Sequence, residues 1–172
     1  LRLARLVIEN GYVSELTAGQ NMAFALLVNM NTVFENAVER AVSTVATKQG
    51  WRVEPQEQTK SLLTGGKHEV TLKPDVTVYD RSDQPLVVGD AKWKTDTPSN
   101  DDFYQLTSYM LGRDAPGALF YPDCAGANQT TATVADQFTL KIVELPTADS
   151  VSSFDDFVAT FEAAMSDVIC KR

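Results

Sequence analysis

The sequence predicts a mixed α/β domain, and three observations lead to that prediction. The chain has 172 residues, the length of one ordinary domain with a core of its own. Hydrophobic residues make up 44% of it and charged residues 22%, a mixture typical of folded globular proteins. Apolar residues recur with helical spacing in some segments and gather in β-branched runs in others. The resulting order is helix, several strands, helix, strand, more strands, helix, which is typical of an α/β fold.

The first part of the chain is expected to be largely helical. Apolar residues within 3–7 predict a short helix that is interrupted near Gly11. A loop is expected over residues 19–21. Apolar residues then recur at three- and four-residue spacing over 23–48, which predicts a long helix that ends at Gly50.

A region rich in strands follows. β-Branched and aromatic residues predict these strands, and Arg81-Ser82-Asp83-Gln84 predicts a hairpin loop between the last two of them. The expected strands are 51–53, 62–63, 68–72, 75–79 and 86–93.

A second helix is expected to begin after Ser99. Ser99 is a good N-cap, and Asp102 stands three residues later, as in a capping box. Phe103, Leu106 and Met110 have the spacing of a buried stripe on this helix.

The remaining chain predicts three further strands and a final helix. The strands are expected at 118–121, 131–134 and 138–145, and an amphipathic helix is expected at 154–169.

We therefore expect a single domain with three parts. Residues 1–22 form an N-terminal helix and loop, residues 23–122 a catalytic core, and residues 123–172 C-terminal strands and a helix. Because the chain begins with Leu1 and not with Met, we expect it to be a fragment of a longer protein.

Composition excludes several classes of protein. The chain has one histidine, His68, and two cysteines, Cys124 and Cys170, so zinc sites and Cys-His or Ser-His-Asp catalysis are disfavoured. From the polar pattern at its start we expect no signal peptide, and the sequence contains no apolar run of membrane-spanning length. Two distant cysteines favour reduced thiols, and we expect a cytoplasmic protein without membrane contact.

Two aspartates and a lysine form the most informative pattern. Counting strand pairs outward from a loop at 81–84 places Asp75 opposite Asp90. Lys92 lies two residues beyond Asp90, so it points to the same face of the sheet, and Lys94 shares this parity. The intervening pairs are Tyr79 with Leu86 and Thr77 with Val88.

Opposed carboxylates repel each other, and a divalent cation between them removes the repulsion. Mg²⁺ prefers hard oxygen ligands and often takes one or two carboxylates together with phosphate oxygens, and Mn²⁺ is a possible substitute. An adjacent ammonium can position water or stabilise charge on a phosphate. The residues Asp75, Asp90 and Lys92 therefore predict a site for phosphodiester hydrolysis.

A structural reading of the same residues is also open. Asp75 could cap a turn after Pro74, Asp90 could end a strand, and Lys92 could be a solvated neighbour. A register slip of one residue would place the aspartates on opposite faces. Against this reading, Asp90 stands inside the apolar run 87–91, where an acid is unexpected.

The motifs resemble those of a known nuclease family. Pro74-Asp75 and, after a step of 15 residues, Asp90-Ala91-Lys92 look like the PD-(D/E)xK signature of restriction-endonuclease-like nucleases. Gln105 and Tyr109 resemble the Q-x-x-x-Y element of RecB-type members. Over residues 20–122 the amino-acid sequence is similar to the nuclease domain of the McrC family, the cleavage subunits of McrBC modification-dependent restriction systems. The segments that carry this resemblance are 29–35, 72–75, 89–94 and 100–109.

The resemblance implies a restriction-endonuclease-like core with a mixed β-sheet flanked by helices, and a Mg²⁺-dependent DNA endonuclease. It also implies a partner, the AAA+ GTPase McrB, which recognises methylated cytosine sites. McrC-type proteins engage McrB through an N-terminal region, and we expect that region to be absent from this chain. The rival predictions are a RecB-like exonuclease of the same fold and a non-catalytic module that docks a motor ATPase.

Three further residues complete the expected site. Glu35, on the helix before the strands, lies at the apolar border of its helix, where it could serve as a third metal ligand or pair with Arg40 or solvent. Gln105 and Tyr109 are four residues apart and off the buried stripe, so they could face the site, although packing explains Tyr109 nearly as well.

The overall charge is unusual for a DNA enzyme. The net charge is −8, whereas domains that bind nucleic acid through their overall field are normally basic. An acidic, lysine-poor surface fits a high-salt cytoplasm, where repulsion from DNA is screened. Alternatively, a basic partner or a further domain supplies the affinity for DNA.

Overall fold

A mixed six-stranded sheet forms the centre of the computed structural model, which describes residues 11–18, 21–59, 62–63, 65–94, 98–123, 129–147 and 153–170. The strand order is β3-β4-β5-β6-β8-β7, with β5, β6 and β8 parallel and the other pairs antiparallel. The strands are β3 (Arg52–Pro55), β4 (Val76–Tyr79), β5 (Pro85–Ala91), β6 (Gly117–Asp123), β7 (Gln129–Val134) and β8 (Phe138–Pro146). The predicted α/β fold with a mixed sheet flanked by helices is confirmed.

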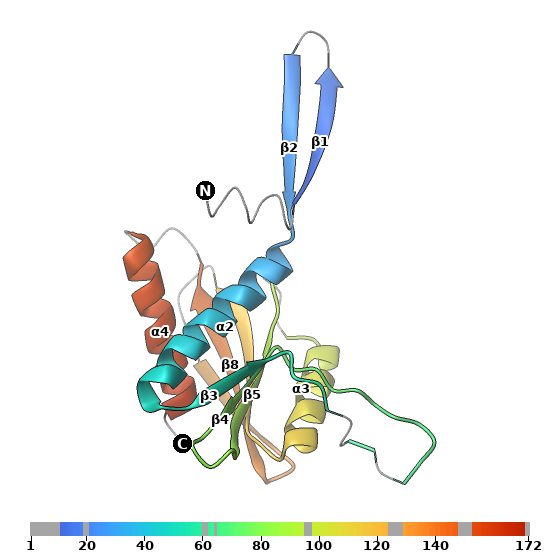
Figure 1. Ribbon diagram of the computed structural model, residues 1–172, viewed down its shortest axis with the longest axis vertical. Helices are drawn as coiled ribbons and strands as arrows, with labels where there is room; N and C mark the ends of the chain where they lie inside the picture. The colour runs from blue at the N-terminus through green and yellow to red at the C-terminus, as the bar shows by residue number, and fades with distance from the viewer. Residues whose placement is uncertain are drawn as a thin grey trace.

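Helices cover both faces of this sheet (Figure 1). The helices α2 (Met30–Gln49) and α4 (Phe154–Cys170) pack on one face, where Phe34, Val38 and Met165 are buried with apolar residues of the strands. The helix α3 (Asn100–Arg113) packs on the other face. In β5, Val87 and Ala91 belong to the first of these cores and Val88 to the second, because successive residues of a strand point to opposite faces.

Residues 11–28 differ from the prediction. They form an antiparallel hairpin of β1 (Gly11–Ala18) and β2 (Asn21–Val28), which extends away from the sheet in Figure 1. The predicted long helix over 23–48 is therefore wrong in its first part. Asn29 explains where the helix begins, because its side chain accepts the N–H of Thr32 as an N-cap. The predicted helix within residues 1–10 lies outside the described residues.

The β4–β5 hairpin has almost the predicted register. Thr77 lies opposite Val88, as expected, and Val76 opposite Gly89. The expected pairing of Tyr79 with Leu86 is wrong: a register shift between Val78 and Tyr79 places Tyr79 opposite Pro85. The Asp80 carboxylate accepts the N–H groups of Ser82 and Gln84, and this local turn absorbs the extra residue.

The chain between β3 and β4 is less regular than predicted. No strand forms at 68–72: within the described residues of this loop, Leu72 makes a single bridge, with Thr59. Residues 62–63 are a turn and a bend, and the predicted strand there is also wrong. Leu72 is nevertheless 3% exposed, so one apolar anchor holds the end of this loop against the core.

The later elements follow their sequence signals closely. Ser99 caps α3, and Asp102 completes the capping box. Leu106 and Met110 are fully buried, as their spacing predicted, whereas Phe103 is only partly buried. The strands predicted at 118–121, 131–134 and 138–145 and the helix predicted at 154–169 are confirmed as β6, β7, β8 and α4.

Gly89 is expected to tolerate no side chain. A methyl group at this position would lie 2.7 Å from Val76 Cγ1 and 2.8 Å from a ring carbon of Phe120, both buried. Because overpacking a core typically costs about 1–3 kcal/mol, Gly89→Ala should lower the free energy of unfolding by that amount. Urea unfolding of this variant beside Gly66→Ala provides the measurement, since an added Cβ at Gly66 meets its nearest atom at 3.8 Å. Equal stability of the two variants would contradict the prediction.

Candidate active site

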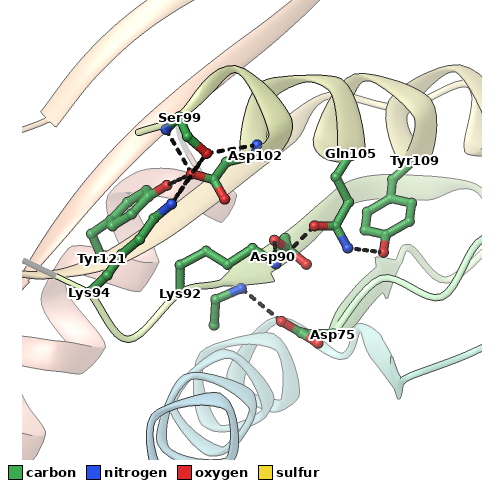
Figure 2. Close-up of polar contacts among 10 residues, drawn as sticks. Asp75, Asp90, Lys92, Lys94, Ser99, Asp102, Gln105, Tyr109 and Tyr121 are labelled. Atoms are coloured by element: carbon green, nitrogen blue, oxygen red, sulfur yellow. Dashed lines mark hydrogen bonds and ion pairs between the residues drawn. The ribbon is translucent and has the colours of Figure 1, made fainter. Parts of the chain in front are cut away.

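The candidate site lies where β5 ends, between the N-terminal halves of α2 and α3 (Figure 2). The strands β5 and β6 are parallel and joined by α3, so the chain leaving β5 passes beside that helix. The carboxyl ends of strands are the usual place for ligands in open α/β sheets. Here that position brings Asp90 and Lys92 next to Gln105 of α3.

Asp90 is a charged residue inside the core. It is 2% exposed, and its Oδ2 lies 2.7 Å from Nζ of Lys92. Burial raises the pKa of Asp90 from 3.8 to about 6; the Lys92 ammonium opposes this shift and the negative charge of Asp75 adds to it. The contact with Lys92 is an ion pair, and no directed hydrogen bond reaches this buried oxygen among the residues the structure describes.

Asp75 lies beside Asp90 at the start of β4. Its Oδ2 accepts the N–H of Ala91 at 2.8 Å, which fixes the carboxylate against the residue between Asp90 and Lys92 (Figure 2). Burial raises the pKa of Asp75, the Ala91 hydrogen bond opposes the shift, and the negative charge of Glu35 adds to it. The negative charge of Asp75 thus acts on Asp90, although strand pairing ends at Val76 with Gly89, one residue short of the predicted pair of Asp75 with Asp90.

Lys92 links the carboxylates to α3. Its Nζ donates to Oε1 of Gln105 at 2.9 Å, and Nε2 of Gln105 donates to the Tyr109 hydroxyl at 2.7 Å (Figure 2). Burial lowers the pKa of Lys92, but the carboxylates of Asp90 and Asp75 raise it further, so the net shift is upward and the ammonium stays charged. Tyr109 fits both interpretations of the sequence, packing in the core and contact with the site. Its ring is buried in the core, and its hydroxyl joins this chain of hydrogen bonds.

Glu35 approaches the site from the opposite side of the sheet. It is half-buried on α2, and its charge contributes to the raised pKa of Asp75. Its position at the border of the apolar stripe is as predicted, next to the buried Phe34. Its role as a third metal ligand stays a prediction.

A second cluster beside the site was not predicted. One carboxylate oxygen of Asp102 accepts hydrogen bonds from Lys94, from the backbone N–H and hydroxyl of Ser99, and from the Tyr121 hydroxyl (Figure 2). Two signals pointed toward it: the shared parity of Lys94 with Lys92, and the capping box. Tyr121 gave no sequence signal, because only the pairing of β6 with β5 brings it to this place.

The donor set suits a hard divalent cation. Asp75 and Asp90 supply neighbouring carboxylates, and within the described ranges the buried Oδ2 of Asp90 has the Lys92 ammonium, 2.7 Å away, as its ion-pair partner but no directed hydrogen bond. In the part of the chain that the structure describes, no three Asp, Glu, His or Cys side chains are grouped as metal ligands. Mg²⁺ does not need such a cage, since it retains waters and takes one or two carboxylates together with substrate oxygens. The residues therefore fit Mg²⁺ better than a metal that requires a protein cage.

Other conspicuous residues have structural roles or no contact with the site. The Trp93 ring packs against Phe34, with ring centroids 5.6 Å apart, and Trp51 packs partly buried against the same core. His68 is exposed on the loop before β4. Of the helices in the described ranges, none combines the length and the apolar character needed to cross a membrane.

Comparison with known proteins agrees with the motifs. The family described as "McrBC 5-methylcytosine restriction system component" matches residues 1–122, which is well over half of the chain. That range contains Asp75, Asp90, Lys92 and the whole of α3. No curated protein matches the sequence. The chain belongs to the family of McrBC 5-methylcytosine restriction system components.

Proposed function

We propose that this chain is the nuclease domain of its restriction system, a Mg²⁺-dependent endonuclease that hydrolyses phosphodiester bonds of DNA. One observation carries the proposal: two adjacent carboxylates and a lysine lie together at the end of β5, and the lysine is oriented by Gln105. A fold could maintain one buried carboxylate for stability, but two mutually repelling carboxylates raise the free energy of the folded state. Such an arrangement is expected where function outweighs stability.

Each residue has a role that its geometry supports. Asp75 and Asp90 would hold the metal, which supplies charge neutralisation and activation of water when it is bound. Lys92 orients the attacking water or stabilises negative charge on the phosphate. Gln105 holds the Lys92 ammonium in place through its Oε1, and Tyr109 fixes the Gln105 amide. Glu35 would assist from α2, either as a further ligand or by its charge.

Lysines are concentrated in the segment of the sequence that carries this site, although the chain as a whole is acidic. Five of the eight lysines fall between residues 60 and 94, and Lys67 and Lys73 are exposed. These side chains give a phosphate backbone a route to the carboxylates despite the net charge of −8. The remaining affinity for DNA would come from an McrB-like GTPase that recognises methylated cytosine.

A cleavage assay separates the candidate functions. The complete complex with its partner GTPase is combined with GTP and methylated closed circular DNA in Mg²⁺ or in EDTA. Linearisation that requires Mg²⁺ supports the endonuclease, and digestion of linear DNA alone supports the rival exonuclease of the same fold. Absence of both activities, with normal binding to the GTPase, would instead identify a docking module.

The domain by itself should bind DNA weakly. Non-specific affinity depends on contacts of Lys and Arg with phosphate, and the net charge of −8 opposes it. Fluorescence anisotropy at low salt should give a Kd of about 1 μM or weaker for unmodified duplex. Clearly submicromolar binding by this chain alone would show that it needs no partner for DNA affinity.

A further inference from the structure

We propose that Asp102 is a positioning residue that holds Gln105 of α3 against Lys92; this inference rests on the proposed nuclease function. Asp102 touches none of the reacting groups assigned above. It acts through the first turn of α3, which it ties to the chain after β5 and to β6.

The contacts of Asp102 exceed what a helix cap needs. A capping box requires only two bonds, one from the Asp102 N–H to the Ser99 side chain and one from the Ser99 N–H to the Asp102 side chain. Here Asp102 is 6% exposed, and its Oδ2 also accepts the Tyr121 hydroxyl at 2.7 Å and the Lys94 ammonium. The Lys94 ammonium lies 5.7 Å from the centre of the Tyr121 ring, so the three side chains form one cluster. Three separate segments therefore meet at a single carboxylate oxygen.

The spacing of the residues connects this cluster to the site. Lys92 and Lys94 follow the end of β5 two residues apart, and the N–H of Lys94 donates to the Lys92 carbonyl at 3.0 Å, so a tight turn holds the two lysines close together along the chain. Asp102 and Gln105 are three residues apart, about one helical turn. The pairs Lys94–Asp102 and Lys92–Gln105 thus form two successive links between the same two segments (Figure 2).

The first link is the stronger one. Although burial alone would raise the pKa of Asp102, the hydrogen bonds from Lys94, Ser99 and Tyr121 bring it well below its ordinary value, so this link stays ionic. The second link is a single hydrogen bond between an ammonium and a neutral amide. Because an exposed side chain such as Gln105 loses rotamer freedom when it is held in one position, it depends on a fixed backbone. Asp102 supplies that fixed backbone.

A double-mutant cycle tests this relation in the complete complex with its partner. Asp102→Ala should lower the cleavage rate about 10-fold in the wild-type background, as expected for a residue that orients another. In a Gln105→Ala background the same substitution should change the rate less than twofold, while its cost in thermal stability should be the same in both backgrounds. An equal loss of rate in both backgrounds would overturn the proposal. Should Asp102→Ala fail to fold, Asp102→Asn removes the charge that holds Lys94 and keeps the cap.

The matched control breaks an ion pair far from the site. Glu162→Gln removes the partner of Lys48, 2.7 Å away between α4 and α2, and should leave the cleavage rate unchanged. If Glu162→Gln lowers the rate as much as Asp102→Ala does, loss of stability explains both effects and positioning is refuted.

A chemical readout that needs no catalysis separates failure of this inference from failure of the nuclease function. The folded chain is treated with an acylating reagent, and modification of Lys92 is followed by mass spectrometry. Asp102→Ala should speed Lys92 modification severalfold, toward the rate in Gln105→Ala, while Glu162→Gln should match the wild type. Unchanged Lys92 reactivity in Asp102→Ala would refute the positioning role even if the wild-type complex cuts DNA. A faster reaction would support it even if no cleavage is found.

Discussion

Asp90→Asn should abolish cleavage and at the same time stabilise the domain. The substitution preserves the shape of the side chain but removes a charged oxygen ligand that Mg²⁺ prefers, so the cleavage rate should fall by at least about 100-fold. Without metal, it removes the buried negative charge that faces Asp75. Lys92 keeps its bond to Gln105 and is 25% exposed, so it is not left as an isolated buried cation.

The stability gain should depend on pH in a defined direction. The pKa of Asp90 is raised to about 6 in the folded state, so the folded protein binds this proton more tightly than the unfolded chain does. The contribution of Asp90 to stability is therefore fully present below about pH 4 and lost as the pH rises through 6. In EDTA, Asp90→Asn should exceed the wild type by about 1–3 kcal/mol at pH 8 and match it near pH 4.

Urea unfolding of both proteins at these two pH values gives the measurement, with cleavage measured in the complete complex. Near-wild-type cleavage by Asp90→Asn in Mg²⁺ would show that Asp90 is not a metal ligand. Outright unfolding of the variant would show that Asp90 is a structural residue.

Lys92→Met should lose cleavage and also lose stability, in contrast to Asp90→Asn. Methionine keeps the apolar stem but removes the only ion-pair partner found for Asp90 in the described residues. Breaking a buried ion pair costs about 3–5 kcal/mol, and the low end applies here because Lys92 is 25% exposed. The loss should be largest at pH 8 and shrink toward pH 4, since protonation of Asp90 removes the unpaired charge. Binding of Mn²⁺, followed by calorimetry, should persist.

The double variant Asp90→Asn with Lys92→Met provides the control for that interpretation. It removes both charges, so its free energy of unfolding should return to within about 1 kcal/mol of the wild type. A double variant as unstable as Lys92→Met alone would mean that lost packing, and not the unpaired carboxylate, causes the destabilisation.

Local signals in the sequence predicted much of the fold. Ser99 and Asp102 mark the start of α3 because a cap and its partner act within one helical turn. The pairing of Thr77 with Val88 followed from the parity of a short hairpin. The apolar run 21–28 was wrongly predicted to be helical, because its pattern suits a strand as well as a helix. Only the N-cap at Asn29 separates this strand from α2.

The candidate site was predictable in its centre but not in its surroundings. Asp90 stands in β5, Asp75 directly before β4 and Lys92 directly after β5, so counting along one hairpin was enough to bring these three residues close together. Gln105 belongs to the next element along the chain, and its spacing to Tyr109 placed both on one helix face. The bond between Asp102 and Tyr121 depends on how β6 lies beside β5, which no short-range pattern determines.

The most direct test of the proposed metal site is a crystal of the domain soaked with Mn²⁺, examined for anomalous scattering. One strong peak is expected at the end of β5, in contact with carboxylate oxygens of both Asp75 and Asp90, and it should be lost in Asp90→Asn. A soaked crystal with no peak at this position, or with a peak that touches neither aspartate, would contradict the proposal that these carboxylates form the metal site of a nuclease.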